Sequence, residues 1–337
     1  LYGIYVSGRQ KSEQSAPAFA PPTDPRQSSV NLFYVDADKT SATRKFVRVA
    51  GFDESVYRIG FWHWEQTRFP SIYHQAFAEL DEIWVPSTFV QDAIAQVSPL
   101  PVFKVPHAIH FSPSKEATRD RFGLPPDKQL VLVMFNFFSC SYRKNPLSAI
   151  EAFRLAAKRS ASLGLVVKTQ NGSSVPKEYA ELQECMRDIP NAILIDDSFS
   201  RQKTWDLESC CDILLSLHRA EGFGLGPAEM MYLGKPVVAT GWSANMDFMD
   251  SDNSMPVRYQ LKPLEEPIFP YEPGPCWAEA DIDHAAWCLM KISQDPAFAA
   301  RISARAKDSI RSQLAPSVIG QQVAERLTLI DKWRKAL

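Results

Sequence analysis

The chain has 337 residues, with 37 Lys and Arg against 39 Asp and Glu, and a formal net charge of −2. At roughly 100–200 residues per domain the length predicts two domains, and a nearly neutral chain gives no general electrostatic reason to bind nucleic acid. A content of 45% hydrophobic and 23% charged residues excludes a wholly disordered chain.

Six cysteines in a chain of this length do not make a secreted disulfide framework, and no C-x-x-C pair is present to hold zinc. No stretch approaches the roughly 20 apolar residues that span a bilayer. The sequence therefore favours a cytoplasmic protein, with peripheral attachment at the inner face of a membrane left open. Because the chain opens with Leu1-Tyr2-Gly3 and not with methionine, we expect it to be part of a longer polypeptide.

The first third of the chain alternates short apolar runs with helical patterns. Residues 10–29 are rich in Pro, Ser and Gln and predict a long loop. Strands are predicted at residues 30–35, 59–64, 82–85 and 102–105. Helical spacing covers residues 72–80 and 88–97, the second with Ser87 as its N-cap. This alternation predicts a parallel sheet covered by helices.

Residues 106–113 are interpreted as a linker, after which a longer series of the same kind begins. Strands are predicted at residues 130–135, 165–168, 192–195, 213–217 and 236–239. Helices are predicted at residues 146–158, 177–186, 201–210 and 227–233. After a Pro-rich segment at residues 262–275, the chain from residue 282 onward has a mostly helical pattern. Two α/β units joined by a linker predict a ligand cleft between them, because open parallel sheets bind ligands beyond the carboxyl ends of their strands.

The most informative segment follows the strand predicted at residues 213–217. A polar turn leads to Glu221, glycines follow at positions 222, 224 and 226, and Pro227 is expected to open the next helix at its favoured first position. Glycines at such a turn let backbone N–H groups approach a ligand, and a helix start favours an anion. Glu221 and Glu229 bracket the turn, so hydroxyls on either side of a bound phosphate could donate to them. A sugar nucleotide has this shape. The alternative is an ordinary glycine-rich turn with a surface glutamate on each side.

Glu221 and Glu229 also resemble the E-x7-E signature of retaining glycosyltransferases of the GT-B fold, in the large family 4 (glycosyl transferases group 1). Further segments resemble the same family in order along the chain. They are YRKNPLSAIEAF at residues 142–153, GKPVVAT at 234–240, CWAEAD at 276–281 and, as in a subset of these enzymes, GFWHWEQTRFP at 60–70 and DEIWVPSTFV at 81–90.

The resemblance implies an α/β fold of the GT-B type, with two Rossmann-like domains facing across a cleft. The acceptor-side domain is expected at residues 1–110 and the nucleotide-sugar-binding domain at 111–315. A helix at residues 316–337 is expected to cross back onto the first domain. The family's first strand, glycine-rich loop and helix are missing, because the chain starts at what resembles the next strand, residues 3–6.

The resemblance also implies roles for individual side chains. Glu229 is expected to accept hydrogen bonds from the nucleotide ribose, and Glu221 from hydroxyls of the donor sugar. Backbone amides of Gly222, Phe223, Gly224, Leu225 and Gly226 are expected near the sugar and phosphates. Lys144, with Arg143, is expected to neutralise the diphosphate leaving group. Relatives often carry an arginine where this chain has Phe138, so the cationic site is expected to rely on Arg143 or Arg219 instead.

On the acceptor side, His63, Trp64 and Glu65 are the candidates, because an aromatic strand end with a titratable pair suits a sugar. The alternative is that Trp62 and Trp64 are core residues and His63 a satisfied polar residue. Alternation along a strand puts Trp62 and Trp64 on one face and His63 on the other, so all of them face the acceptor only where the strand has ended.

The activity that the resemblance implies is transfer of a sugar from a nucleotide-diphosphate sugar to an acceptor hydroxyl, with retention and without a cofactor or metal. The acceptor is expected to be a saccharide, a lipid-linked saccharide or another hydroxyl compound, as in polysaccharide or glycoconjugate synthesis. A GT-B epimerase or phosphorylase, and a non-catalytic module that binds sugar nucleotides, stay open as alternatives.

Two other motifs have competing interpretations. Asp36-Ala37-Asp38 has the D-x-D form that binds metal in another glycosyltransferase fold, but acidic pairs at strand ends are common. His107 and His110 lie in the linker, and as metal ligands they would need a third partner. For both motifs the structural interpretation, with hinge packing for the histidines, is the expectation.

Overall fold

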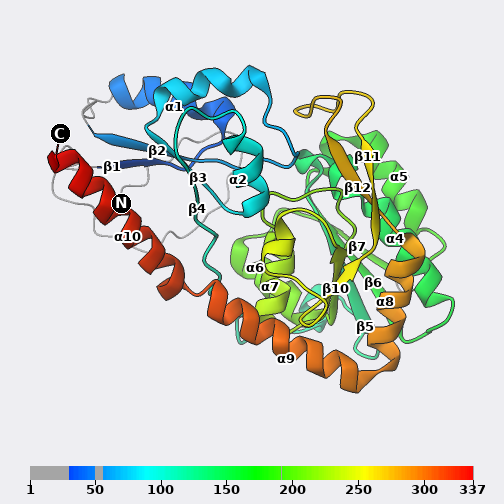
Figure 1. Ribbon diagram of the computed structural model, residues 1–337. Coiled ribbons are helices and arrows are strands. Elements are labelled where there is room, and N and C mark those ends of the chain that lie inside the picture. Colours follow the sequence, from blue (N-terminus) through cyan, green and yellow to red (C-terminus); the bar gives the residue numbers. More distant parts are fainter. Residues whose placement is uncertain (1–29, 50–55, 191, 337) are drawn as a thin grey trace.

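The computed structural model describes residues 30–49, 56–190 and 192–336 (Figure 1). The strand expected at residues 3–6 and the loop expected at residues 10–29 lie outside the described residues. Short apolar strands and amphipathic helices alternate along the described chain, as the sequence pattern predicts.

In the first part of the described chain, one sheet has the strand order β1-β2-β3-β4, and all of its pairs are parallel. Its strands are β1 (Val30–Phe33), β2 (Tyr57–Phe61), β3 (Glu82–Val85) and β4 (Val102–Lys104). The helices between them are α1 (Ala37–Val49), the 3-10 helix η2 (Ser71–Glu79) and α2 (Thr88–Ala95). Ser87 caps α2, its Oγ accepting from the Val90 N–H, as predicted. The sequence analysis missed α1, and it extended β2 beyond its true end at Phe61.

The second sheet has the order β10-β9-β8-β5-β6-β7, again with parallel pairs. Its strands are β5 (Gln129–Met134), β6 (Leu163–Thr169), β7 (Ala192–Asp196), β8 (Ile213–Ser216), β9 (Val237–Thr240) and β10 (Met255–Val257). Its helices are α3 (Ser141–Lys144), α4 (Pro146–Ala157), α5 (Pro176–Met186), α6 (Arg201–Cys210) and α7 (Leu225–Leu233). The buried strands are near-continuous apolar runs, as expected of strands covered on both faces.

The antiparallel pair β11 (Tyr259–Pro263) and β12 (Cys276–Ala280) extends beyond the second sheet and was not predicted. Then come α8 (Ile282–Gln294), α9 (Pro296–Gln313) and α10 (Pro316–Ala336), which match the helical pattern predicted from residue 282. No helix among the described residues is long and apolar enough to cross a membrane.

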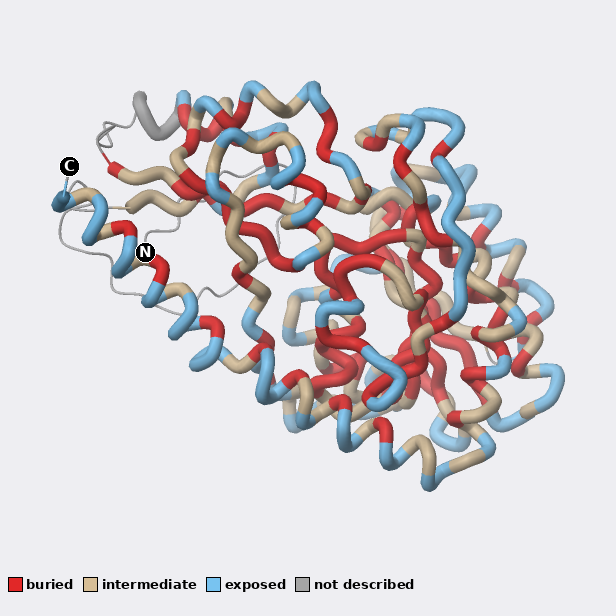
Figure 2. The backbone as a smooth tube through the Cα atoms, in the orientation of Figure 1, coloured by how far each residue is buried: buried red, intermediate tan, exposed pale blue. Residues whose placement is uncertain are grey.

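The last helix, α10, runs alongside the first sheet (Figure 1). It is held there by Arg326, whose Nε and Nη2 donate to the Glu82 carboxylate at 2.9 and 2.6 Å. Glu82 lies on β3 and is fully buried, and it also accepts from Tyr57 Oη and Trp84 Nε1. The outer faces of α9 and α10 are largely exposed, whereas β3 and the central strands of the second sheet, β5, β6, β8 and β9, are mostly buried (Figure 2). The buried ion pair between Arg326 and Glu82 thus ties the last helix to the first sheet.

We expect Arg326→Ala to lower the free energy of unfolding by about 3–5 kcal/mol, because it leaves the buried Glu82 carboxylate without a cation. The double variant Glu82→Met with Arg326→Met should cost less than Arg326→Ala alone, since it removes both charges. Chemical denaturation measures the free energy of unfolding of the parent and of each variant. Lys335→Ala, which breaks an exposed pair with Asp331, is the control and should change stability by less than about 0.5 kcal/mol. A single variant no worse than this control would contradict the assigned role of Arg326.

Candidate active site

The segment after β8 forms a tight turn, residues 221–226, called here the glycine turn. Gly224 has φ +93°, and a Cβ there would lie 3.1 Å from Asn245 Cβ, so the turn requires glycine. Helix α7 begins at Leu225, which makes Pro227 its third residue and corrects the prediction that Pro227 is the first. Gly224 provides no side-chain cap, so the first N–H groups of α7 lack a capping side chain. Such a helix start suits an anion.

Behind this turn lies a cluster of charges that the sequence analysis had assembled from separate segments. Glu221 is 9% exposed and pairs with Lys144 Nζ and, at 3.3 Å, with Arg143 Nη1. Burial alone would raise the pKa of Glu221, but Lys144 and Arg143 outweigh it and lower the pKa to about 2. Burial and the Arg143 charge lower the pKa of Lys144 more than Glu221 raises it. Burial opposes the charge of Arg143 as well, but Glu65, Tyr271 and Glu221 raise the pKa of this guanidinium.

Both cations are carried by α3, a single helical turn whose ends are fixed. Asn145, which ends α3 with φ +52°, donates from Nδ2 to the Leu217 carbonyl at 3.0 Å. The Arg219 N–H donates to the Arg143 carbonyl at 2.7 Å, and Arg143 Nη1 donates to the Ala220 carbonyl at 2.8 Å. Helix α3 is therefore joined to the chain just before the glycine turn by backbone as well as by charge.

A buried polar network supports the other side of Glu221, and the sequence analysis missed it. The Glu221 N–H donates to Ser243 Oγ at 2.8 Å, and His218 Nε2 lies 2.9 Å from Asn245 Oδ1. Asn245 Nδ2 donates to the Thr240 carbonyl at 3.0 Å. Burial lowers the pKa of His218, so it is neutral. The sequence feature that could have indicated this network is the pair of small polar residues just after β9, Ser243 and Asn245. These residues are distant from the glycine turn in sequence but lie beside it in the structure.

Glu229 lies on α7 and is 3% exposed. Its Oε1 accepts from Arg201 and, at 2.7 Å, from Trp205 Nε1. No described residue donates a hydrogen bond to its Oε2. The carboxylate is thus fixed by one oxygen and has the other available, which suits a ligand hydroxyl as donor.

Glu208, on α6, is a fully buried neighbour of Glu229 that sequence reasoning did not identify. Among the described residues, neither of its oxygens has a hydrogen-bond partner. Burial, and after it the Glu229 charge, raise the pKa of Glu208 well above its usual value. Glu208 is therefore a buried carboxyl that favours its protonated form next to Glu229.

Arg219, expected near the donor, is engaged with other protein groups. It pairs with Glu279 on β12, and its guanidinium lies 3.9 Å from the ring centre of Tyr142. Phe138, in the position where relatives carry an arginine, is 61% exposed. The structure therefore places Arg143, and not Arg219, next to Glu221 and Lys144.

The three acceptor-side candidates follow the end of β2, so strand alternation does not separate them. Trp64 is buried, and its Nε1 donates to the Arg68 carbonyl. Glu65 accepts from Tyr271 Oη at 2.9 Å and lies 3.7 Å from Arg143 Nη2. His63 contacts Asp36 and His107. Glu65 thus belongs to the charge cluster, while His63 belongs to a second group of side chains.

The carboxyl ends of the first sheet contact the glycine turn directly. Ser87 Oγ donates to the Gly222 carbonyl at 2.9 Å, and a Cβ on Gly222 would lie 3.1 Å from the Trp64 carbonyl oxygen. The Thr88 N–H donates to Asp247 Oδ2 at 2.8 Å, and Lys104 Nζ lies 3.3 Å from the same atom. The candidate residues of both sheets therefore meet at one place.

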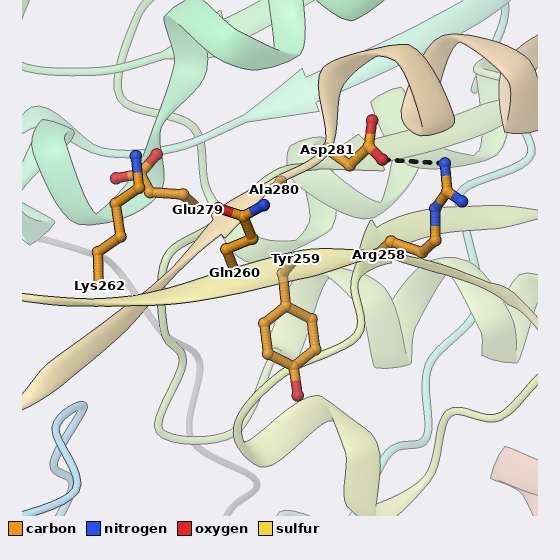
Figure 3. A pocket seen from close by; sticks show the side chains of 7 residues that line it. All are labelled: Arg258, Tyr259, Gln260, Lys262, Glu279, Ala280 and Asp281. Atoms are coloured by element: carbon orange, nitrogen blue, oxygen red, sulfur yellow. Dashed lines mark ion pairs between the residues drawn. The ribbon is translucent and has the colours of Figure 1, made fainter.

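A surface pocket of about 470 Å³ lies elsewhere, along β11 and β12 (Figure 3). In Figure 3, Tyr259 points away from the side of β11 that carries Gln260 and Lys262, and Arg258 pairs with Asp281 at 3.0 Å. Glu279 in its wall is already bound by Arg219. This pocket contains none of the residues of the charge cluster.

The raised pKa of Glu208 predicts how the free energy of unfolding depends on pH. The unfolded chain releases the Glu208 proton near pH 4.5, whereas the folded protein keeps it to higher pH. Glu208 therefore lowers the free energy of unfolding as the pH rises above 4.5, by up to about 1.4 kcal/mol per pH unit until the folded pKa is reached. We expect Glu208→Gln, whose amide is neutral, to match the parent near pH 4 and to be increasingly more stable above it.

Thermal and chemical unfolding between pH 4 and 8 measure this difference. Glu178→Gln, an exposed change on α5, is the control and should show a constant small difference. A constant difference for Glu208→Gln as well would mean that Glu208 is ionised in the folded protein.

No family model matches this sequence, and no curated protein sequence matches it. Solved structures of similar fold do match. TarM from S. aureus, in complex with fondaparinux, α-GlcNAc-glycerol and UDP, has a TM-score of 0.61 at 13% identity. Sucrose-phosphate synthase from Thermosynechococcus elongatus has a TM-score of 0.65 at 15% identity. HepE from Anabaena, in complex with UDP and glucose, has a TM-score of 0.67 at 15% identity.

The match covers 83% of this chain and 53% of TarM, so the chain spans about half the length of that protein. It covers 90% of this chain and 74% of the sucrose-phosphate synthase, and 88% of this chain and 77% of HepE. These neighbours are glycosyltransferases built from two Rossmann-like domains. The likeness confirms the fold predicted from sequence: the chain has the GT-B fold.

Proposed function

We propose that this chain is a retaining glycosyltransferase that moves a sugar from a nucleotide-diphosphate sugar to an acceptor hydroxyl. One observation carries the proposal: Lys144 and Arg143 meet Glu221 at the uncapped start of α7. Two fixed cations and free helix N–H groups suit a diphosphate, and the adjacent carboxylate suits sugar hydroxyls.

The cluster explains how charge could be handled during the reaction. Without a ligand, Glu221 pairs with both cations, and Glu65 lies beside Arg143 as a second carboxylate. A bound diphosphate would share the cations, which would leave Glu221 free to accept hydrogen bonds from the donor sugar. As the glycosidic bond breaks, negative charge grows on the phosphate, and cations already in place stabilise it without reorganisation. Glu229, with Oε2 available, would accept from a ribose hydroxyl.

For the donor base we propose uracil, because two of the similar structures named above hold UDP. For the acceptor we propose a saccharide or a lipid-linked saccharide, in polysaccharide or glycoconjugate synthesis. The chemistry proposed needs neither a metal nor a cofactor. Retention without an enzyme nucleophile implies attack on the same face of the sugar that the diphosphate leaves.

The test has two steps. UDP, GDP and ADP are first screened for thermal stabilisation of the protein, and we expect UDP to stabilise it most. UDP-sugars are then incubated with a panel of saccharide acceptors while NMR follows the anomeric signals. A product with the donor's anomeric configuration supports the proposal, and an inverted product contradicts retention. Release of an epimerised sugar, or a sugar 1-phosphate formed with inorganic phosphate, would identify an epimerase or a phosphorylase. Binding without turnover would identify a non-catalytic module.

We expect Lys144→Ala to reduce turnover by roughly 10²-fold or more while weakening UDP binding much less, because the charge that Lys144 offsets grows in the transition state. Steady-state kinetics and calorimetry of UDP binding separate the two effects. Lys158→Ala, at the exposed end of α4, is the matched control and should leave both values unchanged. A lysine with a purely structural role would instead lower the melting temperature and leave the rate of the folded enzyme intact.

Glu229→Ala should weaken UDP binding by roughly 10- to 150-fold, the equivalent of about 1.5–3 kcal/mol for a lost charge-assisted hydrogen bond. Calorimetry on the folded variant, with Glu178→Ala as the control, measures the loss. An affinity within twofold of the parent would rule out a ribose contact at Glu229.

A further inference from the structure

Three strands of the first sheet, β1, β2 and β4, end at the same edge, and each is followed by titratable side chains. Tyr34 and Asp36 follow β1, His63 follows β2, and His107 follows β4. Because the strands are parallel, their carboxyl ends lie at the same edge, which is where open α/β sheets bind ligands. The sequence analysis had weighed Asp36 as a metal ligand and His107 as hinge packing, and it had not connected either with His63.

These four side chains form a continuous hydrogen-bonded chain. Asp36 Oδ1 lies 3.3 Å from His63 Nδ1, and His63 Nε2 lies 2.9 Å from His107 Nε2. His107 Nδ1 in turn lies 3.3 Å from Tyr34 Oη. The two imidazole rings are stacked, with centroids 5.1 Å apart and planes at 24°. The group is called here the Tyr34–Asp36 chain.

The polarity of this chain follows from its acidic end. Burial opposes the charge of Asp36, but the hydrogen bonds from His63 and the charge of that ring when it is protonated lower the pKa of the carboxyl, so Asp36 is an acceptor. His63 therefore donates from Nδ1. In the neutral form of His63, Nε2 accepts, His107 donates from Nε2 and accepts at Nδ1, and Tyr34 donates its O–H there. In the protonated form of His63 the links from His63 to Tyr34 are reversed, so only the neutral form can take up a proton at the oxygen of Tyr34.

The surroundings of the Tyr34–Asp36 chain keep His107 neutral and leave Tyr34 partly exposed to solvent. Burial, and after it His63, lower the pKa of His107 to about 3, and burial and Asp36 raise the pKa of Tyr34 to about 12. Lys39, on α1, adds a positive charge near Asp36. Tyr34 is 58% exposed, although its ring stacks on Phe61. Part of the Tyr34 side chain is therefore open to solvent.

The chain also contacts the glycine turn. The His107 ring meets Phe223 edge-on, with centroids 4.7 Å apart and planes at 81°. Phe223 lies between Gly222, which the first sheet contacts, and Gly224, which directly precedes α7. A sugar held at the glycine turn would have the Tyr34–Asp36 chain as its neighbour on the side of the first sheet.

A metal site is the alternative use for such residues, and the geometry disfavours it. A metal needs both imidazole lone pairs directed at one point, whereas the two Nε2 atoms here are directed at each other across 2.9 Å. Among the described residues, no group of three or more His, Cys, Asp and Glu side chains is arranged to hold a metal ion. The arrangement suits a proton and not a cation.

We propose that the Tyr34–Asp36 chain is a proton relay that deprotonates the acceptor hydroxyl; this rests on the proposed function. The acceptor gives its proton to Tyr34 Oη, Tyr34 gives its own to His107 Nδ1, and the Nε2 proton of His107 moves to His63 Nε2. An imidazolium is left at His63 beside the Asp36 carboxylate. The acceptor oxygen forms its bond to the sugar C1 as the bond from C1 to the phosphate oxygen breaks, and the diphosphate leaves with that electron pair. After the product leaves, Tyr34 Oη releases the acceptor proton to solvent, the Nδ1 proton of His107 returns to Tyr34, and the extra proton of His63 returns to His107 Nε2, which restores the starting arrangement.

The relay differs from a reaction in which the leaving diphosphate itself takes the acceptor proton, and kinetics distinguish the two. Tyr34→Phe keeps the ring stacking, and His107→Gln and His63→Gln keep polar side chains. With the donor–acceptor pair identified above, each should reduce transfer by roughly 10²-fold or more, with UDP binding within twofold of the parent. His110→Gln is the matched control, because His110 lies in the same linker but bonds Tyr232. Transfer at the parent rate in Tyr34→Phe and His107→Gln would overturn the relay.

Asp36→Asn tests the acidic end of the chain. It removes the carboxylate beside His63, so transfer should fall by roughly 10²-fold while UDP binding stays within twofold of the parent. Transfer at the parent rate in Asp36→Asn would exclude Asp36 from the proton path.

NMR of ¹⁵N-labelled histidine tests the chain without any substrate. We expect His107 to stay neutral from pH 5 to 8, with its proton on Nε2, and to change tautomer in Tyr34→Phe or His63→Gln. A His107 that titrates freely would contradict the relay. If the parent binds no nucleoside diphosphate and transfers no sugar, the proposed function is wrong and the relay falls with it. If the parent transfers and the variants match it, only the relay is wrong.

Discussion

The rest of the candidate site depends on how the Glu221 carboxylate is compensated. A carboxylate that is 9% exposed is costly unless cations and donors surround it. Arg143 and Lys144 supply the charge, and Ser243 fixes the backbone N–H of Glu221. These partners come from α3 and from the segment after β9, so satisfying one anion brings three loops together. The same cations are what a diphosphate would need, and stability and ligand binding therefore draw on one set of charges.

The two glutamates of the E-x7-E pattern are held in different ways. Glu221 is stabilised as an anion by cations, and its pKa is lowered to about 2 after burial is overcome. Glu229 accepts from Arg201 and Trp205 at one oxygen, whereas no described residue donates to the other. An anionic ligand can bind beside Glu221 only if Lys144 and Arg143 give up part of their pairing with Glu221 and pair with the ligand instead. Glu229 keeps a single oxygen available for a neutral hydroxyl, in keeping with a ribose and not a phosphate.

Local patterns in the sequence were sufficient for most of the second sheet. Helix α6 and the strands near β5 to β9 follow from apolar runs and caps, because buried parallel strands leave little ambiguity. Helix α1 was missed because Asp36-Ala37-Asp38 resembles a strand end more than a helix start, and because most of its described buried residues, Thr40, Thr43 and Arg44, are polar. Lys144, Arg143 and Glu221 could be grouped only through the family resemblance. His218, Asn245 and Glu208 could not be found, because their partners lie far away in sequence and only the fold brings them together.

Both candidate groups follow one topological rule. Parallel strands deliver their carboxyl ends to a common edge, and each sheet has its polar residues there. In the second sheet that edge carries the glycine turn and its charges. In the first it carries the Tyr34–Asp36 chain, whose members are too far apart in sequence to form a motif. Ser87, Thr88 and Lys104 bond directly to the second unit, so the two edges are in contact. A reaction that joins a phosphate-bearing donor to a hydroxyl acceptor needs a charged side and a proton-accepting side, and this chain has one on each edge.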